Sequence, residues 1–227
     1  MKNHLVILGG MGPQASIHLH QLIIEKAAAR LSGFNDYPCI LHVSLAVPDT
    51  IASDDAEDAT VLMFDSVCAE LPMENAAAVC IACNTAHLFV DKMQKLPKER
   101  FVSMIEAVAN DAASAGAHKV GLLGSPLTIQ SGLYQDALAA RGIEVVTPDA
   151  TDVNRLNNVI HEVVYGVDPP QLRPVLNEIA GKLEQNGADA ILLGCTELPL
   201  VGVDGPFTVL DSLDSLARAM LARWEHD

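Results

Sequence analysis

The sequence predicts an α/β protein made of two similar halves, each with a doubly wound parallel sheet. Its strand candidates are continuous apolar runs, which are typical of parallel strands covered by helices on both faces. Helical patterns alternate with these runs along the chain. Two pairs of motifs recur at similar spacing, because Gly9 and Cys83 are 74 residues apart and Gly124 and Cys195 are 71 apart. We therefore interpret the chain as a duplicated unit.

Strand and helix patterns follow one another in a regular order. The apolar runs predict strands at residues 4–9, 38–46, 77–83, 101–104, 119–124, 143–147, 188–194 and 207–210. The amphipathic patterns between them predict helices at about 13–31, 56–71, 85–95, 105–115, 128–140, 152–165, 169–186 and 211–224. Such alternation implies right-handed crossovers between parallel strands.

The boundary between the two lobes is expected near residues 101–103. Residues 206–211 have the pattern of a strand followed by a helix cap, which would return the final helix to the first lobe. The predicted lobes are therefore residues 1–102 plus 208–227, and residues 103–207.

The four recurring features lie where ligands bind in such folds. The opening strand of each half ends in glycine and a small residue, at Gly9 and at Gly124, and a later strand ends at Cys83 or Cys195. Ligands of doubly wound sheets bind at the carboxyl ends of the strands. We therefore predict an active site in a cleft between the lobes, with one thiol on each side.

Composition excludes several classes of partner. The formal net charge is −15, and the 14 Lys and Arg residues are scattered rather than clustered, so neither nucleic acid nor a membrane surface is an expected partner. The first apolar run is too short for a signal peptide, and no run approaches the ~20 residues of a membrane-spanning helix. The five cysteines are then expected to be reduced thiols in the cytoplasm.

Cys80 and Cys83 form a C-x-x-C motif, which raises the alternatives of redox chemistry and zinc binding. Residues three apart on one strand point to opposite faces, so we expect Cys80 to pack in the core and Cys83 to emerge at the strand end. The chain has no second C-x-x-C for a four-cysteine zinc site. No metal is therefore expected at the site.

Each site cysteine is followed by polar residues at an expected helix start, where main-chain amides and the helix dipole favour a thiolate. His87 comes four residues after Cys83, whereas Glu197 comes only two residues after Cys195. Both side chains are candidates for tuning the thiols. Because their positions differ, we expect the two thiols to have unlike electrostatic surroundings.

A rival interpretation comes from the first turn. Residues 10–15 fit the dinucleotide-binding pattern G-x-G-x-x-A after a strand. The second strand, however, has no acidic residue at its tip, and Asp49 lies a few residues beyond. We therefore favour a glycine turn that lets a small anion approach the backbone, and we expect no nicotinamide cofactor.

Three motifs together resemble the aspartate and glutamate racemase family, and its aspartate racemase branch most. They are Gly9-Gly-Met-Gly-Pro13, Cys83-Asn-Thr-Ala-His87 and Gly194-Cys-Thr-Glu197, in this order and spacing. The resemblance implies two Rossmann-like lobes related by pseudo-twofold symmetry and a homodimer. It also implies racemisation of a free amino acid without pyridoxal phosphate or metal, in which Cys83 and Cys195 exchange a proton with Cα.

Inverting a stereocentre through a planar carbanion needs an acid and a base on opposite faces, which two thiols would supply. Hydrogen-bond donors must also stabilise the charge that develops on the substrate carboxylate. The candidate substrate-binding residues are Gly10, Met11, Asn84, Thr85, Ser125, Thr128 and Thr196.

Two positions depart from the aspartate-specific pattern. Many relatives carry an arginine and a lysine where this chain has Thr50 and Asp168. From the resemblance we expect an aspartate or glutamate racemase. The two departures make a broad-specificity or non-acidic amino-acid racemase the alternative. A diacid isomerase or decarboxylase, and a binding protein without activity, remain further possibilities.

Overall fold

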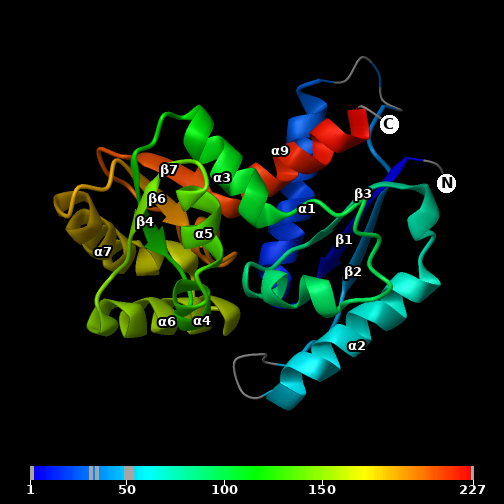
Figure 1. Ribbon diagram of the computed structural model, residues 1–227, viewed down its shortest axis with the longest axis horizontal. Helices are drawn as coiled ribbons and strands as arrows, with labels where there is room; N and C mark the ends of the chain where they lie inside the picture. Colours follow the sequence, from blue (N-terminus) through cyan, green and yellow to red (C-terminus); the bar gives the residue numbers. More distant parts are fainter. Residues whose placement is uncertain (1–2, 31–32, 34–35, 49–53, 226–227) are drawn as a thin grey trace. The chain divides into compact units, whose positions relative to one another are not determined.

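The computed structural model describes residues 3–30, 33, 36–48 and 54–225 and divides the chain into two compact units (Figure 1). Unit 1 comprises Met1–Met104 and Leu216–Asp227, and unit 2 comprises Ile105–Ser215. The second boundary differs from the sequence-based one at residue 208. Strand β7 (Thr208–Asp211) pairs with β6 (Ala190–Leu193) of unit 2, which keeps the start of the last helix in that unit.

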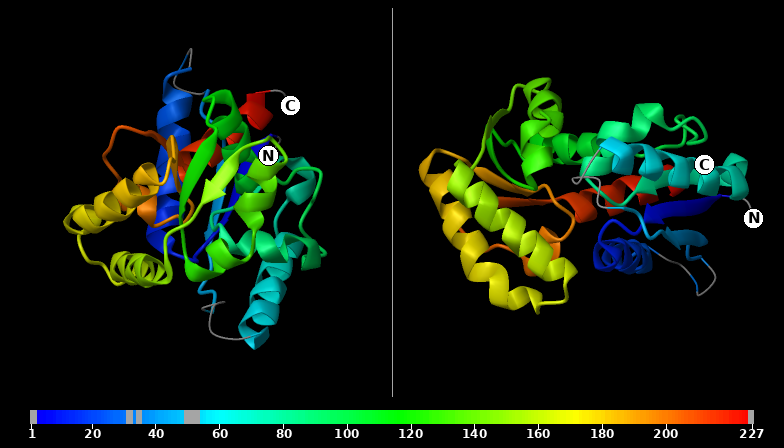
Figure 2. Two further views of the ribbon diagram at one scale, coloured as in Figure 1. Left: turned by 60° about the vertical axis from the view of Figure 1, so that its left-hand side comes forward. Right: turned by 90° about the horizontal axis from the view of Figure 1, so that it is seen from below.

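Unit 1 is built on a three-stranded parallel sheet with the order β2-β1-β3. Its strands are β1 (His4–Gly9), β2 (Ile40–Ser44) and β3 (Ala76–Ile81). Its helices are α1 (Pro13–Ala28), α2 (Asp54–Glu70) and the 3₁₀ helices η1 (Met73–Asn75) and η2 (Thr85–Lys92). Helices α1 and α2 cover opposite faces of this sheet (Figure 2). Strands β1 and β3 are buried along their whole length, as their apolar sequences predict.

Unit 2 is built on a four-stranded parallel sheet with the order β5-β4-β6-β7. Its other strands are β4 (Lys119–Leu123) and β5 (Glu144–Val146). Its helices are α4 (Pro126–Gln130), α5 (Leu133–Ala139), α6 (Ala150–Val164), η3 (Pro169–Leu172), α7 (Arg173–Gln185) and α8 (Leu198–Val201). Helices α3 (Met104–Ser114) and α9 (Ser212–Glu225) contain the points at which the chain passes from one unit to the other.

Alternate residues of the central strands of unit 2 enter two separate cores. Leu122 and Leu192 pack with α3 and α5, whereas Leu123 and Leu193 pack with α6 and α7. A strand turns successive side chains to opposite faces, so a sheet with helices on both faces needs apolar residues at every position. This requirement explains the uninterrupted apolar runs in the sequence.

The two sheets repeat one topology. The order β5-β4-β6 in unit 2 corresponds to β2-β1-β3 in unit 1, with parallel pairing throughout. Unit 2 adds β7 beside β6, whereas the strand predicted at 101–104 of unit 1 is reduced to one bridge between Val79 and Phe101. The predicted α/β class with two parallel sheets is confirmed.

Several predicted helices have different boundaries. The helix expected at 128–140 is divided into α4 and α5, because Gly132 takes a left-handed φ of 79° between them. The helix expected at 85–95 is the 3₁₀ helix η2, and the one expected at 169–186 opens with the 3₁₀ turn η3 around Pro169 and Pro170. Within the residues that the structure describes, no helix is long and apolar enough to cross a membrane.

Candidate active site

In unit 1, the ends of β1 and β3 place the glycine turn beside the first cysteine. Leu8 is paired with Ile81, and the Ala82 amide donates to the Leu8 carbonyl at 2.8 Å. The glycine turn after Leu8 and the segment from Ile81 to Cys83 therefore leave the sheet from neighbouring strand ends. Carboxyl ends of central parallel strands are the usual ligand-binding edge of such a sheet.

The turn after β1 requires glycine at position 10. Gly10 has a φ of 108°, and a Cβ atom there would collide with the main-chain carbonyl of Leu45. The Leu45 amide also donates to the Gly9 carbonyl at 3.0 Å. Backbone from the segment after β2 thus fixes the turn after β1, and only a residue without a side chain fits between them. Helix α1 then begins with Pro13, a favourable first helical residue.

In unit 2, β4 and β6 repeat this arrangement around the second cysteine. Leu123 is paired with Leu193, and the Gly194 amide donates to the Leu123 carbonyl at 2.7 Å. Cys195 lies two residues beyond the paired position in its strand, as Cys83 lies two beyond Ile81. The sequence duplication is therefore also a duplication of strand register at the two cysteines.

The cysteines differ in burial in the way that the sequence predicts. Cys83 and Cys195 are partly exposed, whereas Cys80 is fully buried in β3. Burial strongly raises the pKa of the Cys80 thiol, and burial with the nearby Asp65 charge raises the pKa of Cys68 to about 11. The expectation that Cys80 packs in the core while Cys83 emerges from it is confirmed. Within the described residues, no group of three or more His, Cys, Asp or Glu side chains is arranged to hold a metal.

His87 bonds through both ring nitrogens to the main chain, at Cys83 and at Met104. Its Nδ1 lies 2.9 Å from the Cys83 carbonyl, and the Met104 amide donates to its Nε2 at 3.0 Å. Because Nε2 accepts, the proton is on Nδ1, which donates to the carbonyl. Burial lowers the pKa of His87 to about 4. His87 is thus a neutral ring that holds the turn after Cys83, and its predicted effect on the thiol would act through this turn.

Glu197 contacts the second thiol directly. Cys195 Sγ donates to Glu197 Oε2 at 3.0 Å, and the Thr196 hydroxyl lies 3.2 Å from the same oxygen and donates to it. Glu197 is buried, which raises the pKa of its carboxyl group even though these hydrogen bonds lower it. The two thiols therefore have the unlike surroundings expected from sequence, since a carboxylate contacts Cys195 and an imidazole bonds to the main chain of Cys83.

The predicted substrate-binding side chains lie at the same strand ends. Asn84 and Thr85 are buried at the start of η2. Ser125 is the N-cap of α4, and its hydroxyl accepts from the Thr128 amide at 3.2 Å and lies 3.0 Å from the Thr128 hydroxyl. Both of these side chains are buried. Their geometry holds the turn after β4, and their contact with substrate stays a prediction.

The other predicted positions have different surroundings. Met11 packs against the core cluster of unit 1 that contains Val6 and Leu8. Asp168 precedes η3 and accepts a hydrogen bond from Gln171 at 3.5 Å. Thr50 and Asp49 lie outside the described residues. The helices expected after the two cysteines are a 3₁₀ helix and the four-residue α8, which makes the predicted helix-dipole effect weaker than a long helix would give.

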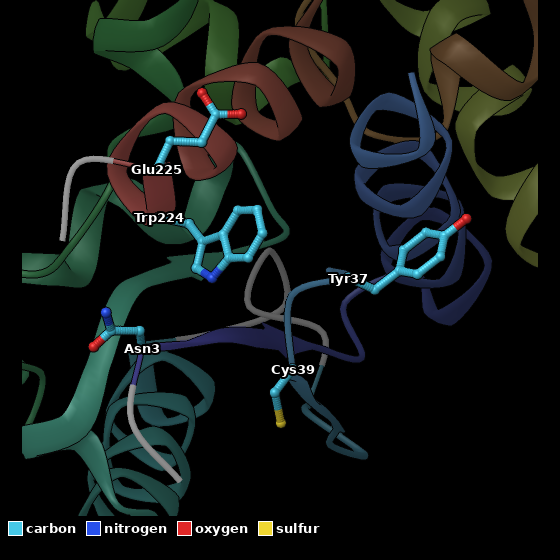
Figure 3. A pocket seen from close by; sticks show the side chains of 5 residues that line it. All are labelled: Asn3, Tyr37, Cys39, Trp224 and Glu225. Atoms are coloured by element: carbon cyan, nitrogen blue, oxygen red, sulfur yellow. The ribbon is translucent and has the colours of Figure 1, made fainter. Parts of the chain in front are cut away.

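A hollow of about 550 Å³ in unit 1 lies at the opposite ends of the strands. Asn3, Tyr37, Cys39, Trp224 and Glu225 line it, as Figure 3 shows. Asn3 and Cys39 come immediately before β1 and β2, whereas Cys83 follows β3. Because the strands are parallel, this hollow is at the amino edge of the sheet, and it is not the candidate active site.

Residues 8–220 match the sequence pattern of the family described as Asp/Glu/hydantoin racemase. The chain belongs to this racemase family. A broad-specificity amino-acid racemase from Bacillus subtilis is 25% identical to this racemase over 224 residues, which cover 96% of each protein. The resemblance predicted from the three motifs is confirmed.

Solved structures agree with this assignment. An aspartate racemase from Picrophilus torridus is 26% identical, with a TM-score of 0.84, and the match covers 99% of this racemase and 95% of that chain. A putative Asp/Glu racemase from Yersinia pestis is 27% identical, also with a TM-score of 0.84, over 99% of this racemase and 100% of that chain. The family and these relatives support an isomerase.

Proposed function

We propose that this protein is a pyridoxal-phosphate-independent racemase of free amino acids, with aspartate or glutamate as its substrate. Cys83 and Cys195 would be the catalytic pair. The observation that carries the proposal is the matched placement of two partly exposed thiols, each two residues beyond the paired end of a central strand. Cys68 and Cys80, the two thiols whose pKa is raised by burial, lack this placement.

The reaction needs one thiolate and one thiol at the start of each turnover. In one direction, the Cys83 thiolate takes the α-proton, and the electron pair moves into the substrate carboxylate to give a planar carbanion. The Cys195 thiol then delivers its proton to the opposite face of Cα. Cys83 ends as a thiol and Cys195 as a thiolate, which is the starting state for the reverse direction. The chemistry requires both sulfur atoms to reach the same Cα.

Glu197 supports the role of Cys195 in both directions. Its carboxylate accepts the Cys195 proton in a hydrogen bond of 3.0 Å, so the sulfur starts as a thiol that is oriented and ready to donate. When Cys195 is to act as the base but still carries its proton, the same carboxylate is placed to accept that proton and leave the thiolate. Burial raises the pKa of Glu197 and so makes it a better proton acceptor than an exposed carboxylate.

The α-proton of an amino acid is far less acidic than a thiol, so the carbanion must be stabilised. We assign this role to amides and polar side chains at the strand ends, each able to lower the barrier by roughly 3 kcal/mol. The proposed set is Gly10, Met11, Asn84, Thr85, Ser125, Thr128 and Thr196.

A second candidate is a racemase of broad specificity. The alignment with the broad-specificity racemase covers 96% of both proteins, and Thr50 and Asp168 replace the cations expected for an acidic side chain. We further propose that the protein works as a homodimer in the cytoplasm. The charge of −15 fits a small-molecule substrate better than nucleic acid or a membrane surface.

The test is proton NMR of each common L-amino acid with the enzyme in deuterated water, without added cofactor. Loss of the α-proton signal of aspartate or glutamate, with formation of the D-isomer, supports the first candidate, and loss for many amino acids supports the second. Cys83→Ser and Cys195→Ser should abolish racemisation, whereas the control Cys68→Ser should keep it. Absence of exchange for every amino acid, with conversion of a small diacid instead, would show an isomerase of another kind.

A further inference from the structure

Helix α1 has apolar side chains on two sides. Ala15, Leu19, Ile23 and Ala27 are buried on its inner side. On its outer side, Ile17 is 60% exposed and Ile24 is 40% exposed. A surface helix normally turns polar and charged residues away from the core, and a helix that is apolar all round is usually covered all round. The outer side of α1 is therefore a candidate contact surface.

The exposed residues of α1 follow the spacing of a helix–helix seam. Five exposed positions are spaced three, four, three and four residues apart, and we call them the α1 seam: Gln14, Ile17, Gln21, Ile24 and Ala28. Helices that pack side by side along a coiled-coil stripe use this repeat. A polar residue within such a stripe, as Gln21 is here, fixes the register of the two helices.

Charge favours a second copy of this chain at the α1 seam. The formal net charge is −15, so two copies repel each other wherever their acidic surfaces meet. Glu25 and Lys26 are the only Asp, Glu, Lys or Arg residues among the 16 residues of α1, and their charges cancel. Helix α2, by contrast, has six acidic residues and no Lys or Arg. Two copies can therefore approach through α1 with little repulsion.

An antiparallel pairing of two α1 helices is self-complementary. The seam runs from residue 14 to residue 28, so its middle is Gln21. A twofold axis at Gln21 places Ile17, four residues before the middle, opposite Ile24 of the second copy, three residues after it. A hollow of about 430 Å³ lies on the same surface, lined by Ile17, His20, Gln21, Ile24, Glu25 and His42. The surface thus carries both protruding isoleucines and a place to receive them, as a contact between identical patches requires.

The side chains beside the seam are complementary in the same pairing. His18 and Glu25 are seven residues apart and therefore lie on one flank of the helix. The twofold axis brings Glu25 of one copy beside His18 of the other, about 1.5 Å apart along the helix direction. Glu25 also accepts a hydrogen bond from Gln21 at 2.7 Å, which holds the carboxylate near the seam. An imidazole donates an N–H in either charge state, so this contact is attractive and forms twice.

We propose that the protein forms a twofold dimer through antiparallel contact between the α1 seams of two copies. The inference rests on the proposed homodimer and names its surface. It does not depend on which amino acid is the substrate or on the two thiols. Because α1 begins with Pro13, directly after the glycine turn, the contact would brace the helix that follows this turn.

The first experiment is the molar mass in solution, from size-exclusion chromatography with light scattering at several micromolar concentrations. We expect a dimer for wild type. For Ile17→Glu we expect the dissociation constant to rise at least roughly a hundredfold, because the change occurs twice and puts a charge at the centre of the interface. Ile24→Glu repeats this test at the facing position. Leu62→Glu is the matched control, since Leu62 is a 70% exposed residue of α2, and it should stay dimeric.

The second experiment tests the register with introduced cysteines. Gln21→Cys should form a disulfide between two copies under mild oxidation, because the twofold axis passes between the two residues. Gln14→Cys should not, since seven residues on each side of the axis separate its two copies by about 21 Å, and a disulfide needs Cα atoms within about 7 Å. Peptide mass spectrometry identifies the bridge and distinguishes it from bridges of native cysteines such as Cys39.

Contrary results separate the inference from the proposed function. If Ile17→Glu and Ile24→Glu dimerise as tightly as wild type, the interface lies elsewhere, and the inference is wrong while the homodimer stands. A monomeric wild type would overturn both, and the seam would then suit a different protein. A bridge through Gln14→Cys but not Gln21→Cys would reject the antiparallel register. Racemisation, followed by the exchange assay, is measured independently of all these outcomes.

Discussion

Cys195 donates its thiol hydrogen to the buried carboxylate of Glu197, with Sγ and Oε2 3.0 Å apart. At the other cysteine of the proposed pair, the His87 ring bonds to the main-chain carbonyl of Cys83. A duplicated scaffold thus presents two chemically different thiols. The difference makes the two half-reactions separable by mutation.

Glu197→Gln should reveal this asymmetry. Glutamine keeps the size of the side chain but cannot accept a proton, so Cys195 should become a poor base. General-base groups typically contribute about 10²–10⁴-fold. We expect solvent deuterium exchange with retention to slow by roughly that factor for the enantiomer deprotonated by Cys195, and much less for the other. The measurement is α-proton loss from pure L- and pure D-substrate, with chirality followed in parallel.

The control for this variant is Glu184→Gln, an exposed carboxylate on α7, which should leave both exchange rates unchanged. Overall racemisation has an equilibrium constant of one, so kcat/KM for full conversion must fall equally in both directions and cannot show the asymmetry. Exchange with retention can show it, and equal slowing of that exchange from both enantiomers would contradict a role of Glu197 at Cys195 alone.

Thiol labelling should separate the cysteines by environment. With a pKa of about 11, Cys68 is about one part in a thousand thiolate at pH 8, whereas an ordinary thiol is roughly one quarter ionised. We expect a small alkylating reagent to modify Cys83, Cys195 and the exposed Cys39 well before Cys68 and Cys80. Peptide mass spectrometry at timed intervals measures each rate.

Substrate should slow the labelling of Cys83 and Cys195 and leave that of Cys39 unchanged, because Cys39 lies at the amino edge of the sheet. Uniform, slow labelling of all five cysteines would argue for a protein without a reactive pair. Protection of Cys39 alone would move the ligand to the other end of the strands.

The sequence reveals those parts of the structure that leave local signals. Continuous apolar runs identify β1, β3, β4 and β6, because strands buried on both faces need apolar side chains at every position. The step from strand to glycine or cysteine then locates the strand ends. The matched register of Cys83 and Cys195 follows from these signals alone.

Contacts made by long-range packing leave no such signal. His20 and His42 are 22 residues apart and share no motif, so only the packing of α1 on β2 brings them together. The Cys195–Glu197 hydrogen bond depends on how a tight turn directs two neighbouring side chains. The 3₁₀ form of η2 is equally hidden, since Asn84 at its start makes no side-chain cap that would mark the helix type.

Stability should fall with acid through His87. Its pKa is about 4 in the folded protein and about 6.5 when unfolded, so the folded state binds fewer protons between these values. Protonation of Nε2 would turn an N–H group against the Met104 amide that now donates to it. Stability from this group is complete above pH 6.5 and is lost as pH falls toward 4. Linkage gives a loss of at most about 2 kcal/mol between pH 7 and pH 5.

Urea unfolding at both pH values tests this expectation. His87→Gln should be less stable than wild type at pH 7, and its free energy of unfolding should change less between pH 7 and pH 5. His118→Gln, which alters an exposed histidine, should keep the wild-type dependence. If His87→Gln shows the full acid loss, other groups such as the buried His4, whose pKa is also lowered, control it.

Two glycines should respond to alanine with opposite signs. Gly10→Ala places a Cβ on the Leu45 carbonyl at a φ of 108°, and both the collision and the left-handed conformation oppose it. We expect a loss of at least about 2 kcal/mol in the free energy of unfolding, since overpacking and strained backbone each cost about 1–3 kcal/mol. Because this turn and Cys83 follow paired ends of β1 and β3, racemase activity should fall as well, even under conditions where the variant is folded.

Gly181→Ala is the matched comparison, because Gly181 lies within α7 and a Cβ there meets no atom within 4 Å. Alanine in a helix interior is favoured over glycine by roughly 0.5–1 kcal/mol, so this variant should be more stable and equally active. Urea unfolding and the exchange assay measure both variants side by side. A Gly10→Ala variant with wild-type stability and activity would mean that the turn after β1 can move away from Leu45, and that its contact with the segment after β2 does not position the Cys83 side of the site.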